Sequence, residues 1–154
     1  MRVIGIDPGT VSIDLCGLAD GEVFLDLSIP TAEACADPDA FVRLLREQGQ
    51  LDVIAGPSGY GLPMIRASEL TEEDLRLAFL APPGERGGIG GLRRLARTLA
   101  DSGLPVVFTP GVVHLPTVSD ARKVNRVDMG TADKVCTAAL AIHEPSKPSQ
   151  APNL

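Results

Sequence analysis

The chain has 154 residues, the size of one ordinary domain, and this length can bury a core without a disulfide or a structural metal ion. Apolar residues make up 44% of the sequence and charged residues 22%, a balance that excludes a disordered or fibrous protein. The net charge of −6 argues against a general binder of nucleic acids. The three cysteines form no CxxC pair and no apolar run reaches the roughly 20 residues that span a bilayer, so we expect a cytoplasmic protein without a membrane segment.

The first thirty residues predict three consecutive strands joined by short turns. A β-rich run over Arg2–Ile6 is stopped by the small residues of Asp7–Thr10, and an extended pattern resumes over 12–19. The pair Asp20-Gly21 is typical of a two-residue hairpin turn. Residues 22–29 alternate in polarity, with Val23, Leu25, Leu27 and Ile29 on the apolar side, as a half-buried strand does.

The rest of the chain alternates helices and strands. A helix is predicted from an N-cap at Asp37 to Gly49, followed by a buried strand over 51–55. A capping box of Thr71 and Asp74 predicts a second helix to about Leu80. After a flexible glycine-rich segment, 84–91, a third helix places Leu92, Leu95, Ala96 and Leu99 on one face and its arginines 93, 94 and 97 on a solvated surface. A strand over 105–109, a long loop and a last helix over 131–143 follow.

This order of elements predicts an α/β fold of the ribonuclease H-like kind, shared with one lobe of actin-like ATPases. Right-handed crossovers place the fourth strand beside the first, which gives a mixed five-stranded sheet of order 3-2-1-4-5 with flanking helices. We expect one domain over residues 1–144 and a disordered tail over 145–154, which is rich in proline. Ligands of such sheets bind at the carboxyl ends of the parallel strands.

The segment Asp7-Pro8-Gly9-Thr10 is the strongest candidate for a binding site. A carboxylate at the end of a buried strand can hold Mg²⁺ directly or through water, so Asp7 is the candidate metal ligand and catalytic residue. The backbone N–H groups of Gly9, Thr10 and Val11 are expected to line an anion-binding turn, and Thr10 and Ser12 add hydroxyl groups. The same residues also suit a plain β-turn, which is the alternative interpretation.

Two loops are candidates for the border of a substrate site. The glycine-rich loop Gly56–Gly61 follows a buried strand and presents Ser58, Gly59 and Tyr60, although ordinary surface loops have the same composition. The second loop carries arginine forks that suit phosphate or carboxylate, but short charged runs are commonly solvated. Its candidate residues, with the first-turn acid of the last predicted helix, are Arg122, Lys123, Asn125, Arg126, Asp128 and Asp133.

The opening VIGIDPGT resembles the first phosphate loop of the superfamily of acetate and sugar kinases, heat-shock chaperones and actin, and also the opening of Holliday-junction resolvases. With GPSGYGLP, PVVFTPGVVHLPTV and RKVNRVDMGTADKV, it resembles a largely archaeal family with a domain of unknown function, also called predicted butyrate kinase, from Met1 to about Glu144. The resemblance implies that Asp7 organises Mg²⁺, that Gly9 and Thr10 contact the phosphate of ATP, and that phosphate is transferred to a short-chain carboxylate.

The chain departs from that resemblance in one respect. Kinases of this superfamily have two lobes, and nothing after Glu144 matches the second phosphate loop or the adenosine-binding segment. We therefore expect an N-terminal lobe that needs a second lobe or a homodimer partner for activity. The alternatives are a metal-dependent nuclease like the resolvases, or a non-catalytic nucleotide-binding or interaction domain. The nuclease lacks the carboxylate usual at the end of the fourth strand, where the chain reads Gly56-Pro57.

Overall fold

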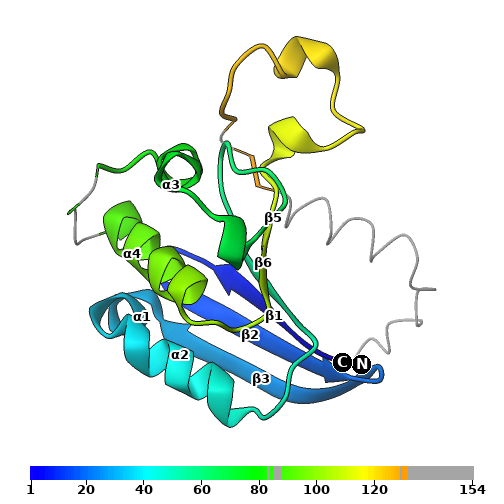
Figure 1. Ribbon diagram of the computed structural model, residues 1–154, viewed down its shortest axis with the longest axis vertical. Coiled ribbons are helices and arrows are strands. Elements are labelled where there is room, and N and C mark those ends of the chain that lie inside the picture. Colours follow the sequence, from blue (N-terminus) through cyan, green and yellow to red (C-terminus); the bar gives the residue numbers. More distant parts are fainter. Residues whose placement is uncertain (83, 85–87, 129, 132–154) are drawn as a thin grey trace, which may run out of the picture.

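The computed structural model describes residues 1–82, 84, 88–128 and 130–131, and its centre is a six-stranded mixed sheet (Figure 1). The strands are β1 (Arg2–Pro8), β2 (Ser12–Ala19), β3 (Glu22–Pro30), β4 (Val53–Ser58), β5 (Ile65–Arg66) and β6 (Val106–Thr109). The helices are α1 (Thr31–Ala36), α2 (Pro38–Glu47), α3 (Glu72–Phe79) and α4 (Gly88–Asp101), with 3₁₀ turns at Ala67–Glu69, Val112–His114 and Asp120–Arg122.

The strand order is β3-β2-β1-β4-β6-β5, which confirms the ribonuclease H-like arrangement. Strand β1 pairs antiparallel with β2 and parallel with β4, where Val3 lies opposite Val53, and β4 in turn pairs parallel with β6. The predicted count of five strands was wrong, because β5 adds a sixth at the edge, antiparallel to β6. A strand of two residues is too short for its alternation to be detected in the sequence.

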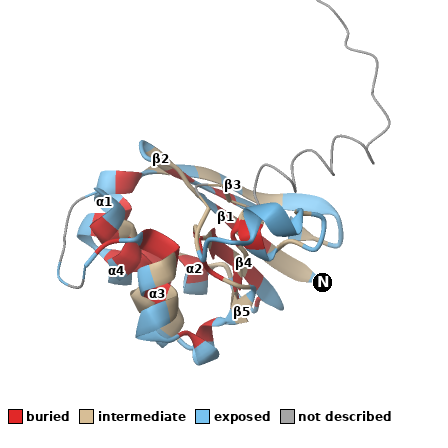
Figure 2. Cartoon of the chain, turned by 90° about the horizontal axis from the view of Figure 1, so that it is seen from above, coloured by how far each residue is buried: buried red, intermediate tan, exposed pale blue. Residues whose placement is uncertain are grey.

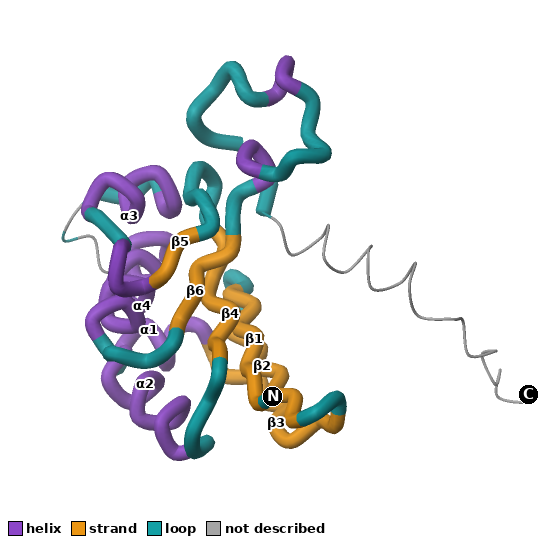
Figure 3. Tube along the Cα trace, turned by 45° about the vertical axis from the view of Figure 1, so that its right-hand side comes forward, coloured by secondary structure: helices purple, strands orange, loops and turns teal. Residues whose placement is uncertain are grey.

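The four helices of the described residues cover one face of the sheet, as the tube in Figure 3 shows. The side chains that point from the strands to the helices form the core, and Figure 2 shows the buried residues between the two layers. The largest fully buried side chains come from both layers: Phe108, Ile4, Ile13, Leu15, Ile54, Leu45, Leu75, Leu95 and Leu99 among them. No helix in the described part of the chain is long and apolar enough to cross a membrane.

The predicted helix starts agree with the structure where the sequence offers a cap. The Asp37 carboxylate accepts a hydrogen bond of 2.9 Å from the N–H of Ala40, and Gly49 follows the end of α2 with φ of +83°. The capping box of Thr71 and Asp74 is formed at the start of α3. Two differences lie where no cap signal exists. The six-residue helix α1 was not predicted, and α4 begins at Gly88, inside the segment expected to be flexible.

Strand β3 departs from simple alternation at its start. The register between β2 and β3 shifts between Gly17 and Leu18, which is a β-bulge. As a result the Phe24 ring turns inward over Gly17, and its Cζ atom would lie 2.6 Å from a Cβ placed on Gly17. The Arg2 guanidinium stacks on the same ring, 3.4 Å from its centre. Val23, expected on the apolar side, is exposed.

Arg93 is buried, in contrast to the solvated surface predicted for the arginines of α4. The side chain of Glu72 at the start of α3 forms ion pairs with both Arg93 and Arg97. One terminal nitrogen of Arg93, Nη1, has no hydrogen-bond partner among the described residues. Burial of an unpaired guanidinium costs free energy, and the ion pair with Glu72 offsets that cost for Arg93 between the two helices.

We predict that Glu72→Ala destabilises the fold by about 1–3 kcal/mol, because it leaves the buried Arg93 charge unpaired. The double variant Glu72→Ala/Arg93→Met is expected to be more stable than Glu72→Ala alone, since an apolar side chain of similar length removes the unpaired charge. Urea unfolding of the two variants and of wild type measures both differences. A double variant less stable than Glu72→Ala would show that the Arg93 charge is held by other groups.

The predicted last helix over 131–143 and the predicted disordered tail over 145–154 lie outside the described residues, apart from Thr131. The candidate residue Asp133 lies outside them as well.

Candidate functional site

A cavity of about 440 Å³ opens at the edge of the sheet where the parallel strands β1, β4 and β6 end. The strand ends and the segments that follow them provide its polar side, and the end of α3 with the start of α4 provides an apolar side. Its lining residues are Ile6, Asp7, Pro8, Gly9, Ser58, Gly59, Tyr60, Ala78, Phe79, Ile89, Leu92, Thr109 and Thr131. Five predicted site residues therefore share one cavity: Asp7, Gly9, Ser58, Gly59 and Tyr60.

Asp7 lies on β1 and points away from the core, because Ile4 and Ile6 use the helix-facing side of that strand. It is directly opposite Asp14 in the β1–β2 ladder. Both residues also line a hollow of about 340 Å³ on the open face of the sheet. The Asp14 carboxylate accepts hydrogen bonds from the hydroxyl groups of Ser28 at 2.5 Å and Ser12 at 3.4 Å.

Sequence reasoning missed Asp14, although the sequence contains the signal. A hairpin with a two-residue loop at Thr10-Val11 fixes the register of the strands on either side. Counting back from the loop places Pro8 opposite Ile13 and Asp7 opposite Asp14, as the structure has them.

The turn after Asp7 is a tight hairpin rather than an open loop. The Gly9 N–H donates to the Ser12 carbonyl at 2.8 Å, and the Thr31 hydroxyl donates to the Gly9 carbonyl at 2.8 Å. The Gly9 N–H is thus already used within the hairpin. Of the predicted phosphate-binding residues only Gly9 lines the cavity. Thr10 borders a separate hollow with Arg94, and Val11 is 82% exposed at the tip of the turn.

The glycine-rich loop is fixed tightly to the end of α3. The N–H groups of Tyr60 and Gly61 donate to the carbonyls of Ala78 and Leu77 at 3.0 and 2.9 Å. A Cβ on Gly59 would lie 2.5 Å from the Ala78 Cβ. Glycine is therefore required at this position for close packing against α3, whereas the sequence offered Gly59 only as a candidate for the border of a substrate site.

Hydroxyl groups at the strand ends are held by neighbouring carbonyls. The Ser58 hydroxyl donates to the Pro110 carbonyl at 2.7 Å, and the Thr109 hydroxyl donates to the Gly56 carbonyl at 3.3 Å. These bonds join the ends of β4 and β6 across the bulge in their pairing. The polar side of the cavity is thereby built on hydrogen-bonded strand ends rather than on separate loops.

Residues 111–128, with 130 and 131, form an arm that projects beyond the sheet edge (Figure 1). Its two ends meet in a β-bridge between Gly111 and Thr131. Its base rests on the glycine-rich loop, since the Asp128 N–H donates to the Tyr60 carbonyl at 3.1 Å and the His114 ring nitrogen Nε2 lies 2.9 Å from the Gly61 carbonyl.

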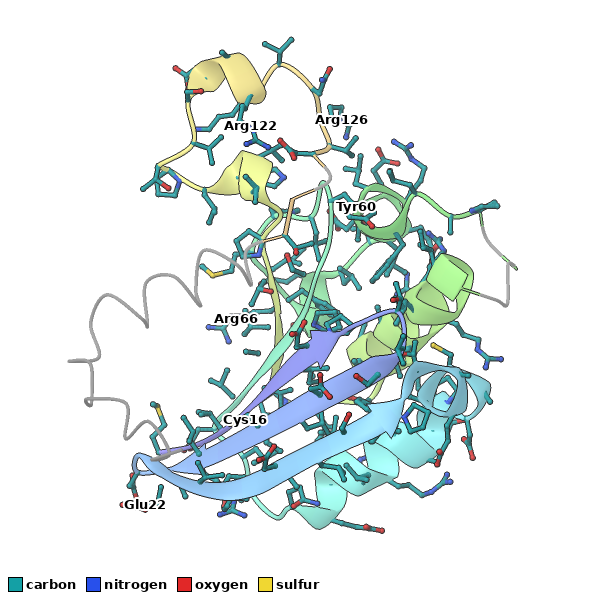
Figure 4. The ribbon with its side chains drawn as sticks, turned by 180° about the vertical axis from the view of Figure 1, so that it is seen from behind. Cys16, Glu22, Tyr60, Arg66, Arg122 and Arg126 are labelled. Carbon is teal, nitrogen blue, oxygen red and sulfur yellow. The ribbon has the colours of Figure 1, made fainter. Side chains whose placement is uncertain are left out.

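The charged residues of the arm lie outside the cavity lining. Figure 4 shows that the arm carries Arg122 and Arg126 beyond Tyr60. Arg122 pairs with Asp128 and thereby lowers the pKa of that carboxyl. Arg126 lies 3.2 Å from Glu73 on α3. Hydrogen bonds from Arg76, with a smaller contribution from Arg126, lower the pKa of Glu73 to about 2. Lys123 and Asn125 are exposed, and neither lines the cavity.

The apolar side of the cavity was also missed. It consists of Ala78 and Phe79 in the last turn of α3 and of Ile89 and Leu92 in the first turns of α4. The spacing of Leu92 predicted a core position, and sequence reasoning placed Ile89 in a flexible segment. Only the packing of α3 beside α4 brings these side chains to one wall.

Within the described residues, no group of three or more histidine, cysteine, aspartate or glutamate side chains is placed to hold a metal ion. Asp7 and Asp14 are a pair of neighbouring carboxylates. A pair fits Mg²⁺ better than a transition metal, because Mg²⁺ keeps several of its waters and takes one or two protein carboxylates.

We predict that Gly59→Ala destabilises the fold by about 1–3 kcal/mol, because its methyl group would overlap Ala78. Gly5→Ala is the matched control, since a Cβ there meets only the Cys16 carbonyl, at 3.9 Å. Thermal unfolding of both variants measures the difference. Equal stability of the two variants would contradict the close packing of the loop on α3.

Comparison with known proteins gives a family and similar solved structures. Residues 5–153 match the model of a family described as protein of unknown function (DUF1464). No curated protein matched the chain. One of the similar solved structures is the acetate kinase from Entamoeba histolytica, which is 9% identical, with a TM-score of 0.49 over 84% of this chain. The similarity covers 39% of that kinase, so the chain spans well under half of its length.

Proposed function

We propose that this chain, which belongs to the DUF1464 family of proteins of unknown function, is the N-terminal lobe of an ATP-dependent phosphotransferase whose acceptor is a short-chain carboxylate. One observation carries the proposal. A single cavity at the carboxyl ends of three parallel strands joins the Asp7 carboxylate and a set of hydroxyl groups to an apolar wall. The motif resemblance described above supplies the reaction class.

Asp7 and Asp14 are the residues that would hold Mg²⁺. Their side chains lie opposite each other on adjacent strands, and both residues line the hollow on the open face of the sheet. Mg²⁺ would neutralise charge on the phosphates of ATP. The strand ends that carry Ser58 and Thr109 would enclose the polar end of the acceptor, while the hydroxyl groups of both residues donate to the Pro110 and Gly56 carbonyls.

The proposed reaction needs no general base in this lobe. A carboxylic acid has a pKa of about 4, so the acceptor is already ionised near neutral pH. A bond forms between a carboxylate oxygen and the terminal phosphorus of ATP, and the bond from that phosphorus to the bridging oxygen breaks. The products are an acyl phosphate and ADP. The contribution of this chain is to position the acceptor and the metal ion.

Phosphoryl transfer also needs positive charge on the transferring group from the opposite side. In the described part of the chain the cavity lining contains no arginine or lysine. The arm's Arg122 and Arg126 already form ion pairs with acids of the same chain. We therefore propose that a second lobe, or a second copy of this chain, supplies the missing cations and the adenosine contacts.

A resolvase-like nuclease has less support. Cleavage with two metal ions needs several carboxylates around the pair of cations. Of the acids that sequence reasoning offered, Asp7 lines the cavity, whereas Asp128 is paired with Arg122 outside it. The end of β4 contributes Ser58 and no acid.

We predict that Asp7→Asn weakens binding of Mg·ATP by about tenfold to a hundredfold, because it removes a charged metal partner. Asp39→Asn, an exposed acid at the start of α2, changes the net charge equally and is expected to leave binding unchanged. Isothermal titration calorimetry with and without Mg²⁺ measures both. Equal binding by wild type and Asp7→Asn would remove Asp7 from the site.

We also predict that the purified chain, as a monomer, does not turn over Mg·ATP with short-chain carboxylates, since no arginine or lysine of the described residues lines the cavity. The assay trapping acyl phosphate as a hydroxamate is run together with analytical ultracentrifugation. Turnover by a monomer that Asp7→Asn abolishes would show that one lobe is sufficient.

A further inference from the structure

The apolar side of the cavity has a construction of its own. Phe79 and Ala78 are buried and form its back, where α3 ends. Leu92 is half-buried beside them, and Ile89, one turn earlier on α4, is 44% exposed at the rim. An isoleucine exposed on the border of a cavity gains favourable contact when a ligand covers it, because apolar area is then removed from water.

This wall lies at a fixed position relative to the polar end. Tyr60 N–H and Gly61 N–H bind the glycine-rich loop to the last turn of α3, so the back of the wall and the loop move together. The Glu72 carboxylate ties the first turn of α3 to Arg93, the residue after Leu92. At this back of the wall, a ligand that is too long would have to displace packed side chains.

We propose that Ile89 and Leu92 select the acceptor by the length of its hydrocarbon tail, with the tail against α3 and α4 and the head at the strand ends beside Asp7. This inference rests on the proposed function for the identity of the head group. It adds the residues that discriminate between acceptors, which neither the family match nor the motifs assign.

The apolar wall predicts how the affinity for a carboxylate depends on the length of its hydrocarbon tail. Each methylene group that the wall removes from water strengthens binding about fourfold, until the tail outgrows the space and binding falls. Leu92→Ala and Ile89→Ala lengthen the space, and the best-bound acid is expected to become longer by about two methylene groups. Ile89→Phe fills the rim and is expected to shorten it. The exposed position of Ile89 lets the fold accept either replacement.

The experiment measures dissociation constants of straight-chain carboxylates from acetate to octanoate, by ligand-observed NMR in Mg²⁺, for the full chain. The variants are Leu92→Ala, Ile89→Ala and Ile89→Phe. Leu104→Ala is the matched control, because Leu104 is also a partly buried leucine packed on the core but does not line this cavity. Circular dichroism verifies the fold of each variant. A parallel series of primary alcohols separates recognition of the tail from recognition of the head.

A length optimum that moves in opposite directions in Ile89→Ala and Ile89→Phe, and stays in place in Leu104→Ala, supports the proposal. Affinity that does not depend on tail length, or an optimum that neither Ile89 variant moves, overturns it. Calorimetry with Mg·ATP on the same samples tests the proposed function separately. A moving optimum without any binding of Mg·ATP would support the wall as a tail-binding site and contradict the phosphotransferase.

Discussion

The parallel pairing of β1 with β4, and of β4 with β6, is the constraint on which the site depends. Parallel strands need long connections, and here each connection includes two helices packed on one face of the sheet. The carboxyl ends of β1, β4 and β6 therefore meet at one edge of the sheet, although Asp7, Ser58 and Thr109 are far apart in the sequence. The hydrogen bonds that the Ser58 and Thr109 hydroxyl groups donate join the ends of β4 and β6 and hold this edge in register.

The cavity is coupled to the helical layer through the glycine-rich loop. Glycine at 59 lets the loop backbone approach α3 more closely than any side chain would allow, and the loop's N–H groups bind the carbonyls at the helix end. The base of the arm rests on the same loop through Tyr60 and Gly61. Contact of a partner with the arm would thus act close to the polar side of the cavity, without any cation of the arm lining it.

Buried charge links the same layer. Glu72 forms ion pairs with two arginines, and only one of them, Arg93, is buried. The pairing is costly in desolvation, but it fixes α3 beside α4 at the height of Leu92. The apolar wall therefore depends on a polar contact behind it, which is the reason that the separation of the two helices matters for the shape of the cavity.

Local signals in the sequence predicted the main strands in chain order and the caps of α2 and α3. They also placed Asp7 at the end of the first strand. Each of these features depends on neighbours within a few residues. The same signals even contained the pairing of Asp7 with Asp14. They did not contain the burial of Arg93, the two-residue strand β5, the apolar wall or the ion pairs of Arg122 and Arg126. Those features depend on which side chains the fold brings together. Glu72 pairs with the buried Arg93, and Asp128 and Glu73 pair with Arg122 and Arg126 of the arm. Periodicity reports which side of a helix is apolar, but only the packing of α3 against α4 decides which part of that side faces the core and which part faces a cavity.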